Sequence, residues 1–224
     1  MGFIYQACPS ESAYIKQITY GRSEGEGQLI RPAEYHWHLV IVRYQGHVQL
    51  LTVGPLSSAG VVSWVDGTEL IWIQLTLGTH MPYLPVRTLL DKEIALPNAS
   101  SQSFWLQGSA WSFPSPDNAD IFVERLARSE LLTRDPVVTA VVDGQPSDLS
   151  ARTVRHRFLH ATGLTQTTVF QMERAQRAAA RLRAGESILD TVCAEGYFDQ
   201  PHLTRSLRRW IGHTPAQLTR SPLS

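Results

Sequence analysis

Cysteines, long apolar runs and signal-like segments are scarce or absent in this sequence. Its 224 residues include only two cysteines, Cys8 and Cys193, which give neither a disulfide framework nor the spacing of a zinc site. No apolar run approaches the roughly 20 residues that cross a bilayer, and the N-terminus lacks the basic region and apolar core of a secretory signal. These absences predict a protein of the reducing cytoplasm without a membrane partner. Cys193 falls near the inner face of a candidate helix over residues 188–195 and is predicted to be a small core residue.

Net charge is also missing, because 20 Lys and Arg residues balance 20 Asp and Glu residues. The balance differs along the chain. Residues 135–224 carry 11 arginines against 8 acidic residues, or +3, whereas residues 1–134 carry 9 basic and 12 acidic residues, or −3. This partition has the direction expected of a C-terminal part that binds nucleic acid. Its small size indicates that groove shape and specific contacts would matter more than a broad basic surface.

The sequence contains no recognisable catalytic constellation. Ser103, Ser109 and Ser112 lie outside any Gly-x-Ser-x-Gly elbow. The glycines of residues 21–27 have neither the spacing nor the following helix of a phosphate-binding loop. We therefore predict that the protein is not an enzyme and requires no cofactor.

What the sequence does contain is a pair of short helical segments near its C-terminus. Ser187 can cap a helix over residues 188–195, because a side-chain oxygen satisfies a free N–H of the first turn. Gly196 supplies the left-handed conformation that ends this helix. Asp199 can cap a second helix, with Pro201 in the first turn, where a missing N–H costs little. A helix, a glycine turn and a second helix make a helix-turn-helix, which fits the DNA major groove.

The second of these helices combines an apolar stripe with a basic outer face. The stripe has i, i+4, i+7, i+8 spacing and consists of Leu203, Leu207, Trp210 and Ile211. The outer face and its flanks, at about 100° per residue, hold Pro201, His202, Thr204, Arg205, Arg208 and Arg209. An arginine run alone is more often a solvated surface, but this run lies on a capped helix behind a glycine turn. Gly212 is expected to end the helix, and Thr214 with Pro215 to begin another.

The run GYFDQPHLTRSLRRWIGHTPAQ, from Gly196 to Gln217, resembles the C-terminal signature of AraC/XylS-type transcription regulators. The run is long, which makes chance agreement a poor explanation. The resemblance implies two helix-turn-helix units joined by a long helix, behind a sensor domain with a cupin-like barrel.

An earlier helix-turn-helix unit is therefore expected upstream. Residues 149–163 fit its recognition helix, with Ser150 as the cap and Gly163 as the end. The buried stripe would be Ala151, Val154, Phe158 and Ala161. The residues facing the other way are Arg152, Arg155, His156 and Leu159.

This first unit departs from the family pattern, which places two helices ahead of the recognition helix. Only residues 136–142, capped by Asp135, have a helical pattern here. Residues 143–148 are too few and too loop-like for another helix. The first helix-turn-helix is therefore predicted to be shortened, and its DNA contacts are less firmly indicated than those of the second helix-turn-helix.

Between the two units, residues 165–183 form a candidate linking helix. They contain no glycine or proline, and their apolar stripe consists of Val169, Met172, Ala179 and Leu182. About 19 residues span roughly 28 Å, which is close to the 34 Å of one turn of B-DNA. This length suits two recognition helices in successive major grooves, although an ordinary bundle helix would also explain it.

Residues up to about 115 have the pattern of strands separated by turns. The clearest strands are 37–44, 47–53, 61–65 and 70–77, rich in Val, Ile, Leu and Trp. Short strands at regular spacing favour a barrel or a sandwich. Residues 117–132 are predicted to form an amphipathic connecting or dimerising helix, with Ile121, Phe122, Leu126 and Leu131 or Leu132 facing inward.

Two groups in this half are candidate sites. Glu34, His36 and His38 alternate, so a strand would place them on one face, where they could bind metal. No acidic residue follows at the spacing of metal-binding cupins, so no metal is predicted. Trp37, Trp64 and Trp72 are candidates to line a ligand pocket, with core packing as the favoured alternative for any one of them.

These patterns predict an α+β protein of two domains. Together with the resemblance, they imply a mostly-β cupin-like barrel and an all-α domain with two helix-turn-helix units joined by a long helix. The expected boundaries are 1–115 for the sensor-like domain, 116–134 for a connecting helix and 135–224 for the DNA-binding domain. The predicted function is sequence-specific regulation of transcription, with an unknown small molecule as effector. A cupin-type metalloenzyme or an interaction module with a helical appendage is the alternative.

The expected partner is double-stranded DNA, with a small-molecule effector, RNA polymerase and a second copy of the chain as further candidates. Arg152, Arg155 and His156 would serve the first groove. Gln200, His202, Thr204 and Arg205 would serve the second groove, with Pro201 on the same face and Arg208 and Arg209 on bases or phosphates.

Overall fold

The computed structural model describes residues 2–220, apart from the side chain of residue 87. The chain divides into two compact units, each described below by itself. The first consists of Met1–Gly27, His36–Pro55 and Ser63–Leu164. The second consists of Gln28–Tyr35, Leu56–Val62 and Thr165–Ser224. The predicted fold class is confirmed, with a β-rich N-terminal region and a helical C-terminal region.

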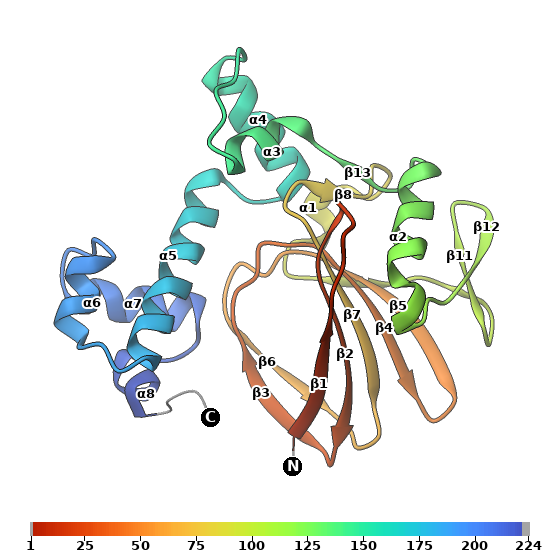
Figure 1. Cartoon of the computed structure of the whole chain (residues 1–224), viewed down its shortest axis with the longest axis horizontal. Coiled ribbons are helices and arrows are strands. Elements are labelled where there is room, and N and C mark those ends of the chain that lie inside the picture. The colour runs from red at the N-terminus through yellow and green to blue at the C-terminus, as the bar shows by residue number, and fades with distance from the viewer. Residues whose placement is uncertain (1, 221–224) are drawn as a thin grey trace. The chain divides into compact units, whose positions relative to one another are not determined.

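The first unit is built on an antiparallel sheet of six strands in the order β1-β2-β7-β4-β5-β9 (Figure 1). These strands are β1 (Gly2–Cys8), β2 (Ile15–Glu24), β4 (His38–Tyr44), β5 (His47–Val53), β7 (Glu69–Leu75) and β9 (Glu93–Ala95). The four strands predicted most clearly correspond to β4, β5, β6 and β7. The six-stranded sheet is open, because β1 and β9 form its edges.

One face of this sheet carries the hydrophobic core. Leu39 pairs with Ile73, and Ile41 with Ile71, and all four side chains are buried in one cluster. Successive side chains of a strand alternate between faces, so Val40 and its partner Trp72 lie on the opposite face.

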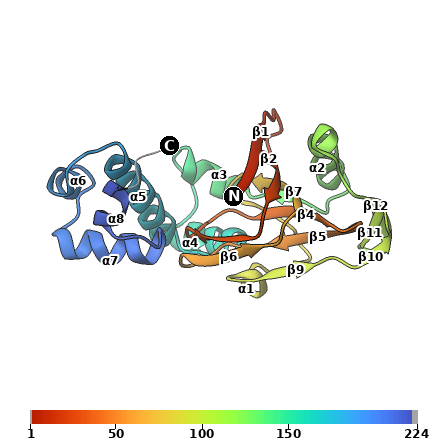
Figure 2. The ribbon, with the colours of Figure 1, turned by 90° about the horizontal axis from the view of Figure 1, so that it is seen from below.

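A helix and a small sheet complete this core. Phe122, Val123 and Leu126 reach it from α2 (Ala119–Arg128), and Phe104 and Trp111 from the small sheet. The small sheet consists of β10 (Asn98–Ser100), β11 (Ser103–Leu106) and β12 (Ser109–Ser112). Figure 2 shows α2 above the strands with β10 to β12 at the end of the sheet.

The helix predicted over residues 117–132 is shorter than expected, and it buries Phe122 and Leu126 as predicted but not Ile121. A 3-10 turn, η1 (Pro116–Asn118), precedes α2, and α2 ends at Arg128. Glu130 then has a left-handed φ of 57°. Ile121 is 59% exposed, so its predicted inward orientation is wrong. Val123 takes the core position instead, and side chains two residues apart on a helix point about 200° apart.

The first unit also contains the first recognition helix, α4 (Ala151–Thr162), which packs against α3 (Pro136–Val142). It also packs against α1 (Val86–Leu89) and against β8 (Thr79–His80), whose partner strand is β13 (Thr133–Arg134). A Cβ on Gly163 would meet Val86 Cγ1 at 2.4 Å. The end of α4 is therefore closely fitted to α1.

The second unit is a cluster of helices around α5 (Gln166–Arg183), as both views show (Figures 1 and 2). The others are α6 (Ile188–Ala194), α7 (Gln200–Trp210) and α8 (Pro215–Arg220), all packed against α5. The predicted stripe of α5 is confirmed, since Val169, Met172, Ala179 and Leu182 are all buried. Most of the two-stranded pair β3 (Gly27–Arg31) and β6 (Gly60–Trp64) also belongs to this unit. Within residues 2–220, no helix is long and apolar enough to span a bilayer.

Candidate nucleic-acid interface

The helix α7 forms where its sequence predicts. The Asp199 carboxylate accepts a 2.6 Å hydrogen bond from the His202 amide, which makes it the N-cap. Pro201 lies in the first turn, where its missing N–H leaves no bond unmade. The apolar stripe is buried, with exposures of 0–3% for Leu203, Leu207, Trp210 and Ile211. The inner face of α7 is therefore fixed, and the outer face is available for binding.

The turn before α7 is tied to the surrounding helices. Gly196 has a left-handed φ of 64° and ends the turn of α6, as predicted. Tyr197 is buried, its hydroxyl lies 3.0 Å from Ser206 Oγ, and the Arg174 guanidinium stacks over its ring at 4.3 Å. These contacts join the turn to α7 and to α5. Cys193 is exposed, so its predicted core position is wrong; Thr191 and Val192 supply the buried face of α6.

The outer face of α7 divides into free and occupied side chains. Gln200, Arg205 and Arg208 are exposed, and neither arginine has an ion-pair partner among the described residues. Arg209 instead stacks on the Trp210 ring at 4.1 Å. Arginine and glutamine side chains that lack internal partners can present their hydrogen-bond groups to base edges or phosphates.

The remaining predicted residues of α7 are partly engaged. The His202 ring packs edge-on against Tyr197 at 5.2 Å, and its Nδ1 accepts a hydrogen bond from the Phe198 amide. The Thr204 hydroxyl donates to the Gln200 carbonyl at 2.9 Å. Pro201 is exposed beside them. His202 and Thr204 thus stiffen the N-terminal half of α7, besides lying on its outer side.

The C-terminal end of α7 has partners that the sequence does not predict. The Ala33 amide donates to the Trp210 carbonyl at 2.7 Å, and the Ala59 amide donates to the Arg209 carbonyl at 2.8 Å. The last carbonyls of a helix have no partner within it. Segments distant in sequence, Gln28–Tyr35 and Leu56–Val62, therefore satisfy them within the second unit.

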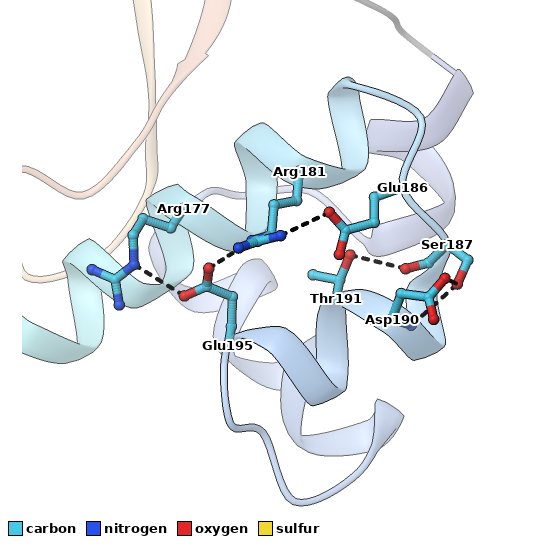
Figure 3. A network of polar contacts seen from close by, with 7 residues as sticks. All are labelled: Arg177, Arg181, Glu186, Ser187, Asp190, Thr191 and Glu195. Carbon is cyan, nitrogen blue, oxygen red and sulfur yellow. Dashed lines mark hydrogen bonds and ion pairs between the residues drawn. The ribbon is translucent and has the colours of Figure 1, made fainter.

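A charged network joins α5 to α6 (Figure 3). The Glu195 carboxylate accepts from Arg177 Nε at 3.0 Å and from Arg181 Nε at 2.9 Å, and its side chain is only 6% exposed. Arg181 Nη1 also donates to Glu186 at 2.9 Å. Hydrogen bonds to Glu186 and Glu195 raise the pKa of Arg181. Ser187 caps α6 by accepting from the Asp190 amide at 3.1 Å, as predicted. The first helix of this helix-turn-helix is thereby fixed to α5.

We expect Glu195→Gln to destabilise the second unit by about 1–2 kcal/mol. The amide has no negative charge and leaves one buried oxygen to accept from two arginines. The loss is limited because both arginines keep access to solvent. Urea unfolding measures this. Glu186→Gln is the matched control, with an expected effect of about 0–1 kcal/mol, since it removes charge from a single, more exposed pair. Equal losses for the two variants would contradict the central role of Glu195.

The first recognition helix, α4, has the predicted cap and end. The Ser150 hydroxyl accepts from the Thr153 amide at 3.2 Å, and Gly163 has a φ of 75°. Phe158 and Ala161 are buried and Val154 is half-buried, but Ala151 is exposed, so its predicted burial is wrong. Ala151 is the first residue of α4, at the end away from the buried Phe158 and Ala161. The side chains of Arg152, Arg155 and His156 are exposed, with no ion pair in the described part of the chain.

The inner side of α4 meets a buried histidine of β8. His80 packs edge-on against His160 at 6.1 Å, and His160 stacks with His156 at 6.4 Å. Asp135, the cap of α3, pairs with Arg157 at 3.0 Å. Burial lowers the pKa of His80 and the nearby His160 lowers it further, whereas the Gly78 carbonyl and Asp135 act in the opposite direction.

The lowered pKa of His80 predicts that the first unit loses stability in mild acid. The unfolded chain takes up this proton near pH 6.5 and the folded chain only at lower pH, so stability falls as pH decreases below about 6.5. Urea unfolding at pH 7.5 and 5.5 measures the effect. His80→Gln should reduce the difference between the free energies of unfolding at the two pH values. An unchanged difference would assign the pH dependence to other groups.

The N-terminal candidates do not form one strand face. Glu34 makes an isolated bridge with Leu56, His36 lies outside the strands, and His38 begins β4. His36 contacts Lys16 Nζ and Gln74 Nε2, each at 3.3 Å, while His38 accepts from Trp72 Nε1. No three His, Cys, Asp or Glu side chains of the described residues are grouped so that they could hold a metal ion.

The three candidate tryptophans occupy different environments. Trp37 is 2% exposed and belongs to the hydrophobic core. Trp64 packs edge-on against Phe3 at 5.6 Å, and a Cβ on Gly27 would meet its ring at 2.6 Å. Trp72 is half-buried beside His38 on the face of the sheet opposite the core. Trp37 is therefore a core residue, in agreement with the favoured alternative for it.

A capped and exposed second helix, held by a buried stripe behind a glycine turn, defines a DNA-binding domain of the helix-turn-helix class. Residues 147–221 match the family model described as a helix-turn-helix domain, of the AraC type. The match begins just before α4, so α3 lies outside it. The family comprises DNA-binding regulators and is not an enzyme class. Neither a curated protein nor a solved structure matches the chain significantly.

Proposed function

We propose that the protein is a sequence-specific transcription regulator whose main reading element is α7. The observation that carries this proposal is the outer face of α7, where Gln200, Arg205 and Arg208 are exposed while the inner face is fully packed. Arginine can donate two hydrogen bonds to guanine, and glutamine can make a bidentate pair with adenine. We assign these three residues to bases or adjacent phosphates in one major groove.

The helix α4 is proposed to serve a second groove through Arg152, Arg155 and His156, which are exposed on its outer face. The linking helix α5 has 18 residues, and these span about 27 Å, against about 34 Å for one turn of B-DNA. One chain could therefore address two successive grooves, and DNA binding does not require a second copy. RNA polymerase and a second copy of the chain are further partners that this function would accommodate.

An unknown small molecule is proposed as the effector, bound on the face of the six-stranded sheet opposite its hydrophobic core. That face carries the linked pair Trp72 and His38 and also Gln74, whose amide contacts His36. An aromatic ring beside imidazole and amide groups suits a planar polar ligand. A metabolite panel should contain a compound that raises the melting temperature of the wild type and not of Trp72→Ala. If every stabilising compound acted equally on both proteins, this assignment would be wrong.

The regulator function is tested by capturing genomic DNA fragments with the purified protein at two salt concentrations. Specific binding predicts an enriched motif with two blocks about one helical turn apart, and the motif should survive the higher salt. Weak capture without a motif, lost in high salt, would show non-specific binding and overturn the proposal. A single conserved block would restrict reading to one recognition helix.

A further inference from the structure

The residue just before α7 is an exposed aromatic one. Phe198 is 91% exposed, more than any other large hydrophobic side chain in the described part of the chain. It lies between the buried Tyr197 and the N-cap Asp199. A large apolar side chain exposed to this degree leaves most of its surface in water, and its burial by a partner would favour binding.

Phe198 is exposed although its backbone is held in a defined position. Its amide donates to His202 Nδ1 at 3.4 Å, and the next residue caps the helix through the 2.6 Å bond to the His202 amide. An apolar residue at this position often packs against the fourth residue of the helix. That residue, Leu203, is already 0% exposed. The burial of Leu203 therefore does not depend on Phe198, and the exposed ring extends from a backbone held by hydrogen bonds.

The surroundings of Phe198 match DNA in charge. It adjoins the N-terminus of an 11-residue helix, the positive end of the helix dipole, which favours phosphate. Gln200 is exposed two residues further on, and Arg205 is exposed on the same helix. The carboxylate of the next residue, Asp199, is occupied as the N-cap. An apolar group within a polar and cationic surface suits a base edge flanked by phosphates.

We propose that Phe198 contacts the 5-methyl group of a thymine at the edge of the base pairs read by α7. This inference rests on the proposed function, because it requires α7 to enter a major groove. The N-terminal residues of a recognition helix are those that reach base edges. The thymine methyl is the one apolar group that a base edge presents in the major groove, and phenylalanine is among the side chains that contact it. Phe198 would thereby add a preference for thymine next to the base read by Gln200.

The test replaces each thymine of the captured motif in turn by deoxyuridine, which lacks only the 5-methyl group. At one position the wild type should bind about fourfold more weakly, as expected for losing contact with one methyl group. Phe198→Ala should bind the unmodified DNA more weakly by at least this factor, and should be indifferent to deoxyuridine at that position. Leu189→Ala, which shortens another exposed side chain of the same unit (69% exposed), should still discriminate thymine from deoxyuridine.

The outcomes separate this inference from the proposed function. Specific binding by the wild type, with no thymine whose replacement is coupled to Phe198, overturns the thymine contact and leaves the regulator function intact. Absence of specific binding by the wild type overturns both. Unchanged DNA binding by Phe198→Ala, with loss of transcriptional activity in cells, would assign the ring to a protein partner and also overturn the inference. Thermal unfolding of Phe198→Ala should match the wild type, because the ring buries almost no surface.

Discussion

Replacement of Gly212 by alanine is expected to destabilise the second unit by about 2–5 kcal/mol, from backbone strain and overpacking together. Gly212 follows α7 with a left-handed φ of 81°. A Cβ at this position would lie 2.3 Å from Ile30 Cγ2 and 3.1 Å from Ala59 Cβ. The change therefore strains the backbone and also displaces the segments that hold the end of α7. Hydrogen exchange of the α7 amides measures the loss locally.

Gly185→Ala provides the matched control for this prediction. Gly185 also follows a helix of the second unit with a positive φ, 90°, but nothing lies within 4 Å of its Cβ position. Its replacement should cost about 1–2 kcal/mol from the backbone alone. Ile30→Ala should relieve part of the cost of Gly212→Ala, since it removes the methyl group in closest approach. Equal effects at Gly212 and Gly185, without relief by Ile30→Ala, would contradict the packing described.

Arg205→Ala is expected to weaken binding to the captured motif by about 1–3 kcal/mol, roughly 5- to 150-fold, and to relax the preference at one base pair. The residue is exposed on α7, and the described residues provide it with no ion-pair partner. Its loss should therefore leave folding almost unchanged. Titration of the protein against the motif and its single-base variants measures both the affinity and the preference.

Arg128→Ala is the control for the change in charge. Arg128 is an exposed arginine at the end of α2, in the first unit. Its replacement should alter binding only slightly and equally for all sequences. If Arg205→Ala weakened binding to every sequence by the same factor, the side chain would be a phosphate contact. An unchanged affinity would remove Arg205 from the interface.

The helical part of the chain could be predicted closely because its signals are local. Ser150, Ser187 and Asp199 each cap the helix that they were expected to cap. A cap, a stripe and a terminating glycine lie within a dozen residues of one another, so they can be recognised without knowledge of the tertiary fold. The choice of residues that read DNA is also local, since it follows from the outer face of α7. That choice stays a prediction until the binding experiments are done.

Three predictions of buried residues are wrong, at positions where packing against other elements decides which side chain is buried. Ile121, Ala151 and Cys193 lie at the margins of their apolar stripes and are exposed. The element packed against a helix selects which marginal residue is buried, and one sequence does not identify that element. The same limit applies to strand pairing, such as that of Thr79–His80 with Thr133–Arg134, which joins segments far apart in sequence.

The hydrogen bonds from Ala33 and Ala59 to the end of α7 have a consequence for protein engineering. A fragment beginning at residue 135 would contain both recognition helices and the whole family match, yet it would lack two donors to α7 and the side chain of Ile30 beside Gly212. Fusing that fragment to a foreign domain should therefore yield a chimaera in which α7 frays at its C-terminal end. A working exchange of the N-terminal region would have to retain segments 28–35 and 56–62, so the helical part of this protein is less separable than its order in the sequence suggests.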